Sequence, residues 1–147
     1  MLNQFLAGGV VSICNITIHA LVMTAVVRVS QAISTKYTLH PSLFLISVMI
    51  ATVSVLMAAH TSEVMVWSLA YLILDAAPPG SKLVYFAFVN YTTLGYGDVI
   101  PVEDWRLLGP MTAMNGVLLF GWSTAVIFEV LRKAMSHSSY AAGSEQR

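Results

Sequence analysis

The sequence predicts an all-α integral membrane protein with three transmembrane helices and a shorter helix between the second and the third. Two observations predict this class. Of the 147 residues, 57% are hydrophobic and 10% are charged, whereas soluble domains carry about 25% charged residues. Long runs without a charged residue also recur, at 1–27, 37–62 and 107–128, and a spanning helix needs roughly 20 mostly apolar residues.

The composition also narrows the expected partners. Seven Lys and Arg residues balance seven Asp and Glu residues, so the chain lacks the net positive charge that attracts polyanions. We therefore expect membrane lipids, and no nucleic acid, as partners. Cys14 is the only cysteine, so the chain has no intramolecular disulfide.

Residues 1–40 are expected to form an N-terminal transmembrane helix followed by a cytoplasmic loop. A signal peptide is the alternative for the first segment. That segment lacks a basic start, and its apolar run exceeds the roughly 7–15 residues of a signal-peptide core. We therefore interpret it as a retained helix.

The second helix is expected over residues 43–74, which contain no Pro and no Gly. One continuous helix would be about 48 Å long at 1.5 Å per residue. It would then tilt or protrude, because the hydrocarbon core is only about 30 Å thick. A break at residues 60–62 is the alternative, and Pro78 and Pro79 end the helix in either case.

A fourth apolar stretch, residues 83–89, is too short to span a bilayer, and residues 90–98 after it contain two glycines. Backbone without helical hydrogen bonds is tolerated at membrane depth only when it is buried in protein or lines water. A short helix followed by such a loop, placed between two spanning helices, therefore predicts a re-entrant loop.

The third spanning helix is expected over residues 103–133. Glu103 and Asp104 favour its start, because acidic side chains stabilise the positive end of a helix dipole. Pro110 lies near this start or kinks the helix. Residues 134–147 are expected to form a disordered cytoplasmic tail.

Charge asymmetry predicts the orientation in the membrane, because basic residues concentrate on the cytoplasmic side. Three spans place most of the basic residues on one side, and Lys82 and Arg106 lie on the other side among several acids. The C-terminus is then cytoplasmic, the N-terminus lies outside, and the re-entrant loop enters from outside a cell membrane. The basic residues of the cytoplasmic side are Arg28, Lys36, Arg132, Lys133 and Arg147.

Residues 92–98 read Thr-Thr-Leu-Gly-Tyr-Gly-Asp, which resembles the selectivity filter of potassium channels. A dehydrated cation needs a shell of oxygens in place of water, and inward-pointing backbone carbonyls provide it. Such a backbone requires partly left-handed dihedrals, which Gly95 and Gly97 adopt at little cost. Thr93 adds a hydroxyl oxygen, while the side chains of Leu94 and Tyr96 are expected to pack against surrounding helices.

The resemblance extends over roughly residues 64–133. Residues 82–92 look like the pore helix, in which Tyr85 and Phe86 brace the filter at 93–97. Asp98 would lie at the outer mouth and is followed by Val-Ile-Pro, the usual exit of this family. The whole chain looks most like small bacterial single-pore channels with one extra N-terminal helix, and residues 41–133 would be the pore domain. The residues expected to support the filter are Tyr85, Phe86, Thr92, Asp98 and Trp105.

Two positions depart from the family pattern. Leu94 stands where Val is most common, which affects packing or conductance. Val89 stands where some members carry a Glu that bonds the filter aspartate. Asp98 is therefore expected to find another partner, either Trp105 or Tyr85.

The resemblance implies potassium-selective, passive conduction through a homotetramer, because one chain supplies one loop of a four-loop ring. K⁺ in the filter is then the only metal ion expected, and no cofactor is needed. The chain shows no nucleophile–base pair, phosphate loop or metal motif, so we do not expect an enzyme.

Residues of the third spanning helix are candidates for the gate and cavity. Phe120, Thr124 and Phe128 are spaced four apart and share one helical face. Phe128 would close the pore by dewetting. Gly116 lies near the position of the family's hinge glycine, and Gly121 competes for that role. Ordinary helix packing is the alternative for all of these residues.

Four buried polar residues lie outside this pore pattern. Glu63 is an acid within an apolar span, and His60 lies three residues before it on the same face. Asn15 and His19 lie on one polar stripe of the first helix. We expect these four side chains to meet between the first two helices, where they either hold the helices together or respond to pH.

Three other functions stay open. A weakly selective cation channel is favoured if Leu94 or Val89 loosens the filter. A membrane enzyme or metal transporter would use His19, His60 and Glu63. A non-conducting regulatory subunit is the third alternative.

Overall fold

The computed structural model describes the backbone of residues 1–33 and 41–144 and the side chains of residues 1–29 and 42–136. It contains four α-helices and one short 3₁₀ turn, and the described residues form no strand. The elements are α1 (Leu2–Ile33), α2 (Pro41–Ile73), α3 (Leu83–Tyr91), the turn Glu103–Trp105 and α4 (Leu108–Ser144). The predicted loop at 34–40, including Lys36, and residues 145–147 lie outside the described residues.

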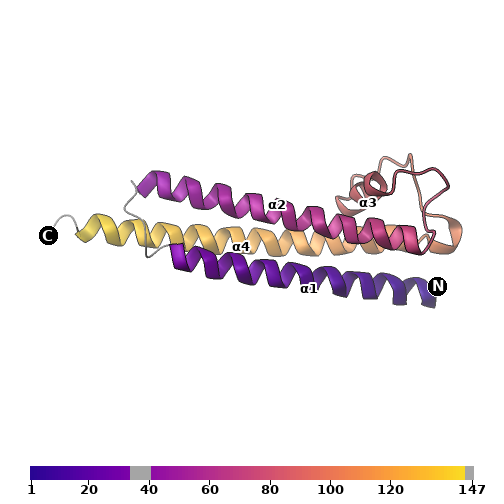
Figure 1. The fold of residues 1–147 in the computed structure, drawn as a ribbon, viewed down its shortest axis with the longest axis horizontal. Coiled ribbons are helices and arrows are strands. Elements are labelled where there is room, and N and C mark those ends of the chain that lie inside the picture. The colour runs from indigo at the N-terminus through magenta and orange to yellow at the C-terminus, as the bar shows by residue number, and fades with distance from the viewer. Residues whose placement is uncertain (34–40, 145–147) are drawn as a thin grey trace.

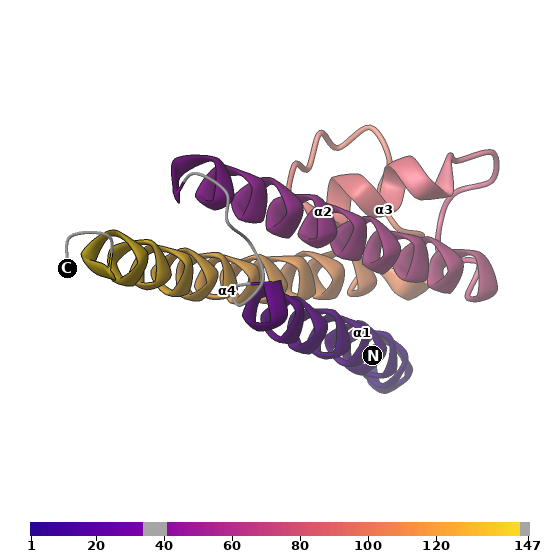
Figure 2. The same ribbon diagram turned by 60° about the vertical axis from the view of Figure 1, so that its left-hand side comes forward.

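Three of the helices form one elongated bundle (Figure 1). Helices α1, α2 and α4 all contact one another, and they run side by side in both ribbon views (Figures 1 and 2). The N-terminus, the end of α2, the start of α4 and the short α3 lie together at one end of the bundle. The C-terminus lies at the other end, so α2 runs antiparallel to α1 and α4.

These three helices are long and apolar enough to cross a membrane, over Leu2–Val29, Ser42–Ile73 and Glu103–Ser136. The all-α membrane fold class is therefore confirmed. Helix α2 is continuous through residues 60–62, because Ser42–Ile73 contains neither Pro nor Gly. It ends at Ile73, and Asp75 just past this end adopts a left-handed φ of 49°. There Ala76 N–H donates to the Tyr71 carbonyl at 3.0 Å, a common helix C-terminal cap.

Helix α4 differs from the expected third helix at both ends. It begins at Leu108 rather than at residue 103, because Glu103–Trp105 form a 3₁₀ turn before it. The Gln4 side chain of α1 caps this start, since its Oε1 accepts a hydrogen bond from Leu107 N–H at 2.9 Å. Helix α4 also continues to Ser144, so residues 134–144 are helical rather than disordered. No Pro interrupts this segment, and its Gly lies at its far end.

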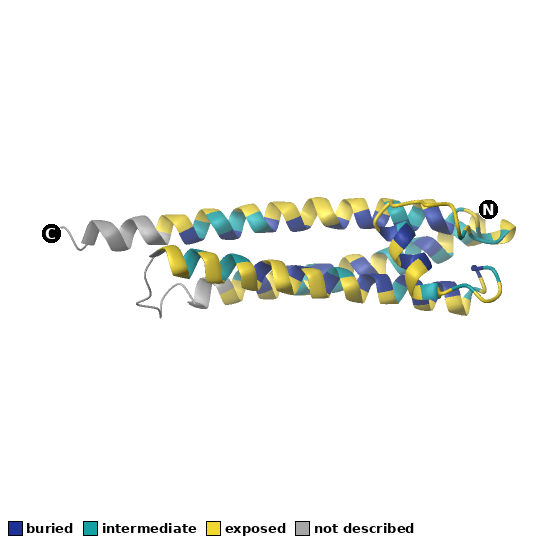
Figure 3. Ribbon diagram, turned by 90° about the horizontal axis from the view of Figure 1, so that it is seen from above, coloured by how far each residue is buried: buried dark blue, intermediate teal, exposed yellow. Residues whose placement is uncertain are grey.

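The burial pattern suits a membrane protein that has further neighbours. Buried residues follow the inward faces of the long helices, and exposed residues cover most of the outward surface (Figure 3). Many of the exposed residues are large and apolar, for example Leu21, Ile50 and Ile73. The largest buried cluster lies under α3, where the Tyr71 and Phe86 rings have centroids 4.7 Å apart. Helix α3 is thereby fixed against the end of the bundle.

Candidate functional site

The loop after α3 leaves the helix through a hydrogen-bonded cap. Leu94 N–H donates to the Val89 carbonyl, and Thr93 N–H donates to the Asn90 carbonyl, both at 3.0 Å. This pair of bonds requires a left-handed residue just past the helix, and Thr93 has a φ of 60°. The cap therefore fixes the direction in which the predicted filter leaves α3.

The backbone of the predicted filter alternates in handedness. φ is positive at Thr93 (60°), Gly95 (57°) and Gly97 (78°), and at neither residue between them. In an extended strand, successive carbonyls point in opposite directions. A reversal of φ at every second residue turns successive carbonyls toward one side instead. Glycine occupies two of the three left-handed positions, where a Cβ would be strained.

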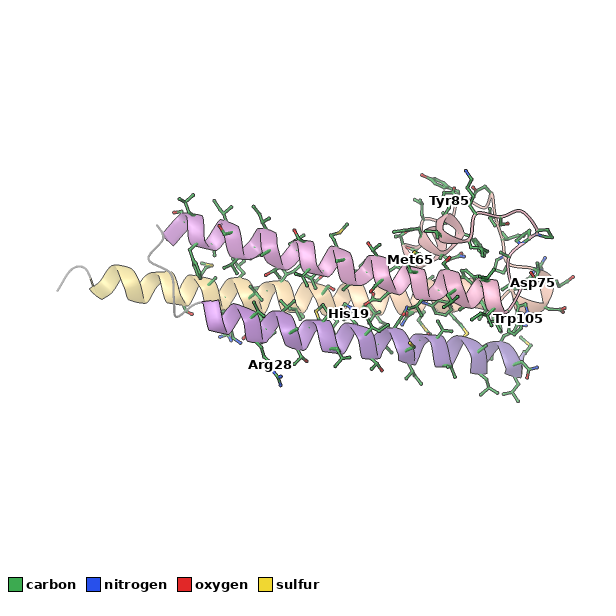
Figure 4. The ribbon with its side chains drawn as sticks, in the orientation of Figure 1. His19, Arg28, Met65, Asp75, Tyr85 and Trp105 are labelled. Atoms are coloured by element: carbon green, nitrogen blue, oxygen red, sulfur yellow. The ribbon has the colours of Figure 1, made fainter. Side chains whose placement is uncertain are left out.

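Asp98, at the end of this loop, is held by α3. Tyr85 donates a hydrogen bond from its hydroxyl to Asp98 Oδ2 at 2.7 Å, and this bond raises the pKa of Tyr85 above its ordinary value. Of the two partners considered, the structure thus has Tyr85. Trp105 packs instead against the buried cluster under α3. Tyr85 and Trp105 both lie at the end of the bundle that carries the loop (Figure 4).

The remaining residues predicted to form or support the filter differ in how far they are exposed to solvent. Phe86 is fully buried beneath α3, and Thr92 donates its hydroxyl proton back to the Phe88 carbonyl at 2.7 Å. Leu94 and Tyr96 are 52% and 69% exposed. The expectation that these two side chains pack against surrounding helices is therefore not met within one chain, because more than half of each residue is exposed.

The structure gives Gly116 a packing role. A Cβ at this position would lie 2.0 Å from the carbonyl oxygen of Tyr91, so only glycine lets α4 approach the end of α3 so closely. Gly121 has open space around its Cβ position. Tyr91, on the other side of this contact, lies just before the predicted filter in the sequence.

The gate candidates lie on one accessible face of α4. Phe120 is 36% exposed, Phe128 is 67% exposed, and Thr124 is also exposed. Thr124 donates its hydroxyl proton to the Phe120 carbonyl at 2.9 Å, so its hydroxyl oxygen faces its own helix. Thr124 and Phe128 are uncovered within one chain, as pore-lining residues would be, whereas Phe120 also packs against the rings of His60 and Tyr91.

A family model described as an ion channel matches residues 59–133. The chain belongs to this ion channel family. The matched segment runs from the second half of α2 through α3 and the loop to the middle of α4. No curated protein and no solved structure matches the chain.

The channel also contains a buried polar cluster about midway along the bundle, where Figure 4 labels His19. His19 Nδ1 lies 2.7 Å from Glu63 Oε1, and His60 Nδ1 lies 3.0 Å from Glu63 Oε2. His19 and Glu63 are fully buried. Three of the four predicted members therefore meet between α1 and α2.

Asn15, the fourth predicted member, lies one turn away and makes different contacts. Its amide donates to the Glu63 backbone carbonyl at 3.2 Å and to Asn115 Oδ1 at 3.1 Å. Trp67 Nε1 donates to the same Asn115 oxygen at 3.0 Å. Asn15 therefore links all three long helices without touching the Glu63 carboxylate.

Two members of the cluster were missed at the level of sequence. The Tyr91 hydroxyl donates a hydrogen bond to Glu63 Oε2 and lies 2.9 Å from His60 Nδ1. Ser123 Oγ lies 2.9 Å from His60 Nε2 and 3.3 Å from His19 Nε2. Tyr91 was assigned to the pore helix by the family pattern. Ser123 adjoins Thr124, and neither its residue type nor its spacing distinguished it from the other small polar residues of this helix.

The donor atoms of His19, His60 and Glu63 lie within 4.8 Å of one another, and among the described residues this is the group close enough to hold a metal ion. A metal would have to break the hydrogen bonds that join these side chains to one another and to Tyr91 and Ser123. All three side chains therefore already have hydrogen-bond partners within the protein.

Proposed function

We propose that this ion channel conducts K⁺ selectively and passively through a homotetrameric pore lined by the carbonyls of residues 93–97. The observation that carries the proposal is the alternation of positive φ at Thr93, Gly95 and Gly97. This alternation supports a row of carbonyls on one side of the loop. Such a row replaces the hydration shell of a permeating cation.

The same geometry supports a tetramer. One loop offers carbonyls on only one side of an ion, and ion channel families generally form oligomeric pores. The exposure of Leu94 and Tyr96 supports this state, since neighbouring subunits would cover them. A closed cyclic assembly supplies the fourfold axis. In this assembly the exposed face of α4 with Phe120, Thr124 and Phe128 would line the cavity.

The proposed orientation places the N-terminus and the filter loop outside the cell membrane and the C-terminus in the cytoplasm. The structure has the N-terminus and the loop at the same end of the bundle. Arg28, Arg132 and Lys133 belong to the opposite half, and the positive-inside rule assigns that half to the cytoplasm.

The test is a flux assay on purified channel in liposomes, under a K⁺ gradient and then a Na⁺ gradient. We expect K⁺ flux that Ba²⁺ blocks, little Na⁺ flux, and loss of flux in Gly95→Ala, because alanine is strained at a φ of 57°. Gly80→Ala is the matched control, since Gly80 also has a positive φ of 79° but lies outside the filter.

Each alternative gives its own result. Equal K⁺ and Na⁺ flux, with the same loss in Gly95→Ala, indicates a weakly selective cation channel. No flux of either ion from a folded tetramer, at every pH and also in Phe128→Ala, indicates a non-conducting subunit. Equal loss of flux in Gly80→Ala and Gly95→Ala would show that the loss reflects folding rather than the filter.

A further inference from the structure

Two histidines of the buried cluster share a single serine hydroxyl. Ser123 Oγ contacts His60 Nε2 at 2.9 Å and His19 Nε2 at 3.3 Å. On their opposite edges, the Nδ1 atoms of both rings contact the two oxygens of Glu63. All four ring nitrogens are therefore within hydrogen-bond distance of a partner, and the available protons can be counted.

With Glu63 ionised and both histidines neutral, the cluster lacks one proton. Each neutral imidazole has one N–H, and the contacts with Glu63 use both. Ser123 has one hydroxyl proton, so it can donate to only one of the two Nε2 atoms. The other contact would then bring two lone pairs together, inside a fully buried site.

One additional proton completes every hydrogen bond. If one imidazole is doubly protonated, its Nε2–H donates to Ser123, and Ser123 donates to the other ring. The same proton on Glu63 gives a second pattern, which provides a partner for every ring nitrogen and leaves only the His60 Nδ1–Glu63 Oε2 contact without a proton. In that case Glu63 donates to Tyr91, Tyr91 donates to His60 Nδ1, and His60 Nε2–H donates to Ser123. Both patterns contain the same number of protons.

The charge balance also requires this proton. A carboxylate at membrane depth is costly unless it is paired, and no Lys or Arg side chain among the described residues pairs with Glu63. The titratable groups that face one another here all belong to the cluster itself and come from α1, α2 and α3. Helix α4 adds uncharged Ser123 and two rings, with Phe120 4.6 Å from His60 and Trp122 5.3 Å from His19. The titratable groups are His19, His60, Glu63 and Tyr91.

We propose that this cluster is a proton-binding site, and that one proton shared by His19, His60 and Glu63 ties α4 to α1 and α2 through Ser123. Loss of the proton leaves a net negative charge and one repulsive contact at Ser123. Ser123 adjoins Thr124 on the proposed cavity face, and Tyr91 adjoins Thr92 at the start of the proposed filter. The consequence for conduction, which rests on the proposed function, is that ion flux depends on pH.

Proton binding can be measured without any ion flux. The channel is labelled with ¹⁵N-histidine, and imidazole protonation is followed by NMR in lipid, with His19→Gln and His60→Gln to assign the signals. Infrared absorption of a protonated carboxyl, assigned by Glu63→Gln, detects the alternative proton position. We expect one proton to bind, with both rings responding together as coupled sites do.

The link to α4 is tested by the pH dependence of K⁺ flux. We expect flux to change with pH in the wild type and this change to disappear in Ser123→Ala. Ser47→Ala is the matched control, because Ser47 is an exposed serine of α2 that bonds only its own helix, at the Leu43 carbonyl. It should retain the wild-type pH dependence.

The outcomes separate the two proposals. If both rings stay neutral and Glu63 stays ionised while the channel remains folded, the proton site is wrong. Stoichiometric Zn²⁺ binding that Glu63→Gln abolishes would also overturn it, since the cluster would then be a metal centre. A bound proton together with unchanged pH dependence in Ser123→Ala would refute the link to α4. Absence of flux at all pH values counts against the channel function and leaves the spectroscopic test valid.

Discussion

At the scale of single residues, Gly116 lets α4 pack closely against the end of α3 at Tyr91. We predict that Gly116→Ala destabilises the protein by at least about 1–3 kcal/mol, the usual cost of overpacking. The added Cβ would lie 2.0 Å from the Tyr91 backbone oxygen, which cannot move aside as a flexible side chain can. Thermal unfolding in detergent measures the effect.

Gly121→Ala is the control for this prediction, because a Cβ at Gly121 meets nothing within 4 Å. It should unfold at or above the wild-type temperature, since alanine favours helix over glycine. Equal stability of the two variants, combined with altered flux in Gly116→Ala alone, would contradict the packing role. It would favour a hinge at Gly116 instead.

The hydrogen bond between Tyr85 and Asp98 predicts that the stability of the loop depends on pH. This hydrogen bond raises the pKa of the Tyr85 hydroxyl. Because the folded pKa exceeds the unfolded value, this bond stabilises the loop fully below about pH 10. The stabilisation is lost as the pH rises through the raised pKa. Ultraviolet titration of tyrosine, with Tyr85→Phe to isolate the Tyr85 signal, should show this group ionising late, and Asp98→Asn should move its pKa down. An unchanged titration curve in Asp98→Asn would contradict this hydrogen bond.

The residues of the buried cluster show how far sequence reasoning reaches. Glu63, His60 and His19 could be predicted because ionisable side chains are rare in apolar spans. The roles of Tyr91 and Ser123 could not, because both residue types are ordinary in such segments. Their contribution depends on how α3 and α4 are placed against α2, which helical periodicity within one segment does not specify.

At the scale of elements, Tyr71 connects three helices through one hydroxyl. Thr112 donates its proton to the Leu108 carbonyl at 2.7 Å, so Tyr71 donates to Thr112 at 2.6 Å and accepts from Asn90 at 3.2 Å. Tyr71→Phe should cost about 1–3 kcal/mol, because buried polar partners are left unsatisfied. Thermal unfolding measures it.

Tyr85→Phe is the matched control for Tyr71→Phe, since it removes the same hydroxyl from a solvent-exposed tyrosine. It should leave global unfolding nearly unchanged. If both variants unfold at the wild-type temperature, the Tyr71 hydroxyl does not stabilise the junction of α2, α3 and α4.

The helices themselves followed from the sequence where local signals were strong. The continuous α2 reflects the absence of Pro and Gly from Ser42 to Ile73, and it ends at a left-handed cap before the predicted double proline. The predicted start of α4, at residue 103, was wrong by several residues. The Gln4 side chain of α1 instead caps the helix at Leu107 N–H from across the bundle. A cap supplied by a residue far away in the chain leaves no signal in the sequence near the helix start.

At the scale of the whole molecule, one chain is incomplete as a pore. Leu94 and Tyr96 of the loop and Phe128 of α4 are each more than half exposed. Four copies around one axis would supply neighbours to each of them. The chain should therefore migrate as a tetramer in mild detergent, with its mass measured by light scattering, and a monomer there would contradict the proposed pore.

The ions themselves should hold that tetramer together. A ligand that binds only the assembled state stabilises it by RT ln(1 + [L]/Kd), or about 2.7 kcal/mol at 100 times Kd. If the carbonyls of residues 93–97 form K⁺ sites, the tetramer should dissociate at a higher temperature in KCl than in NaCl of equal ionic strength. Gly95→Ala should remove this difference, because it disturbs the left-handed backbone of the sites, whereas Gly80→Ala should keep it. Equal dissociation temperatures of the intact wild-type tetramer in both salts would mean that the loop does not prefer K⁺, whatever its sequence resembles.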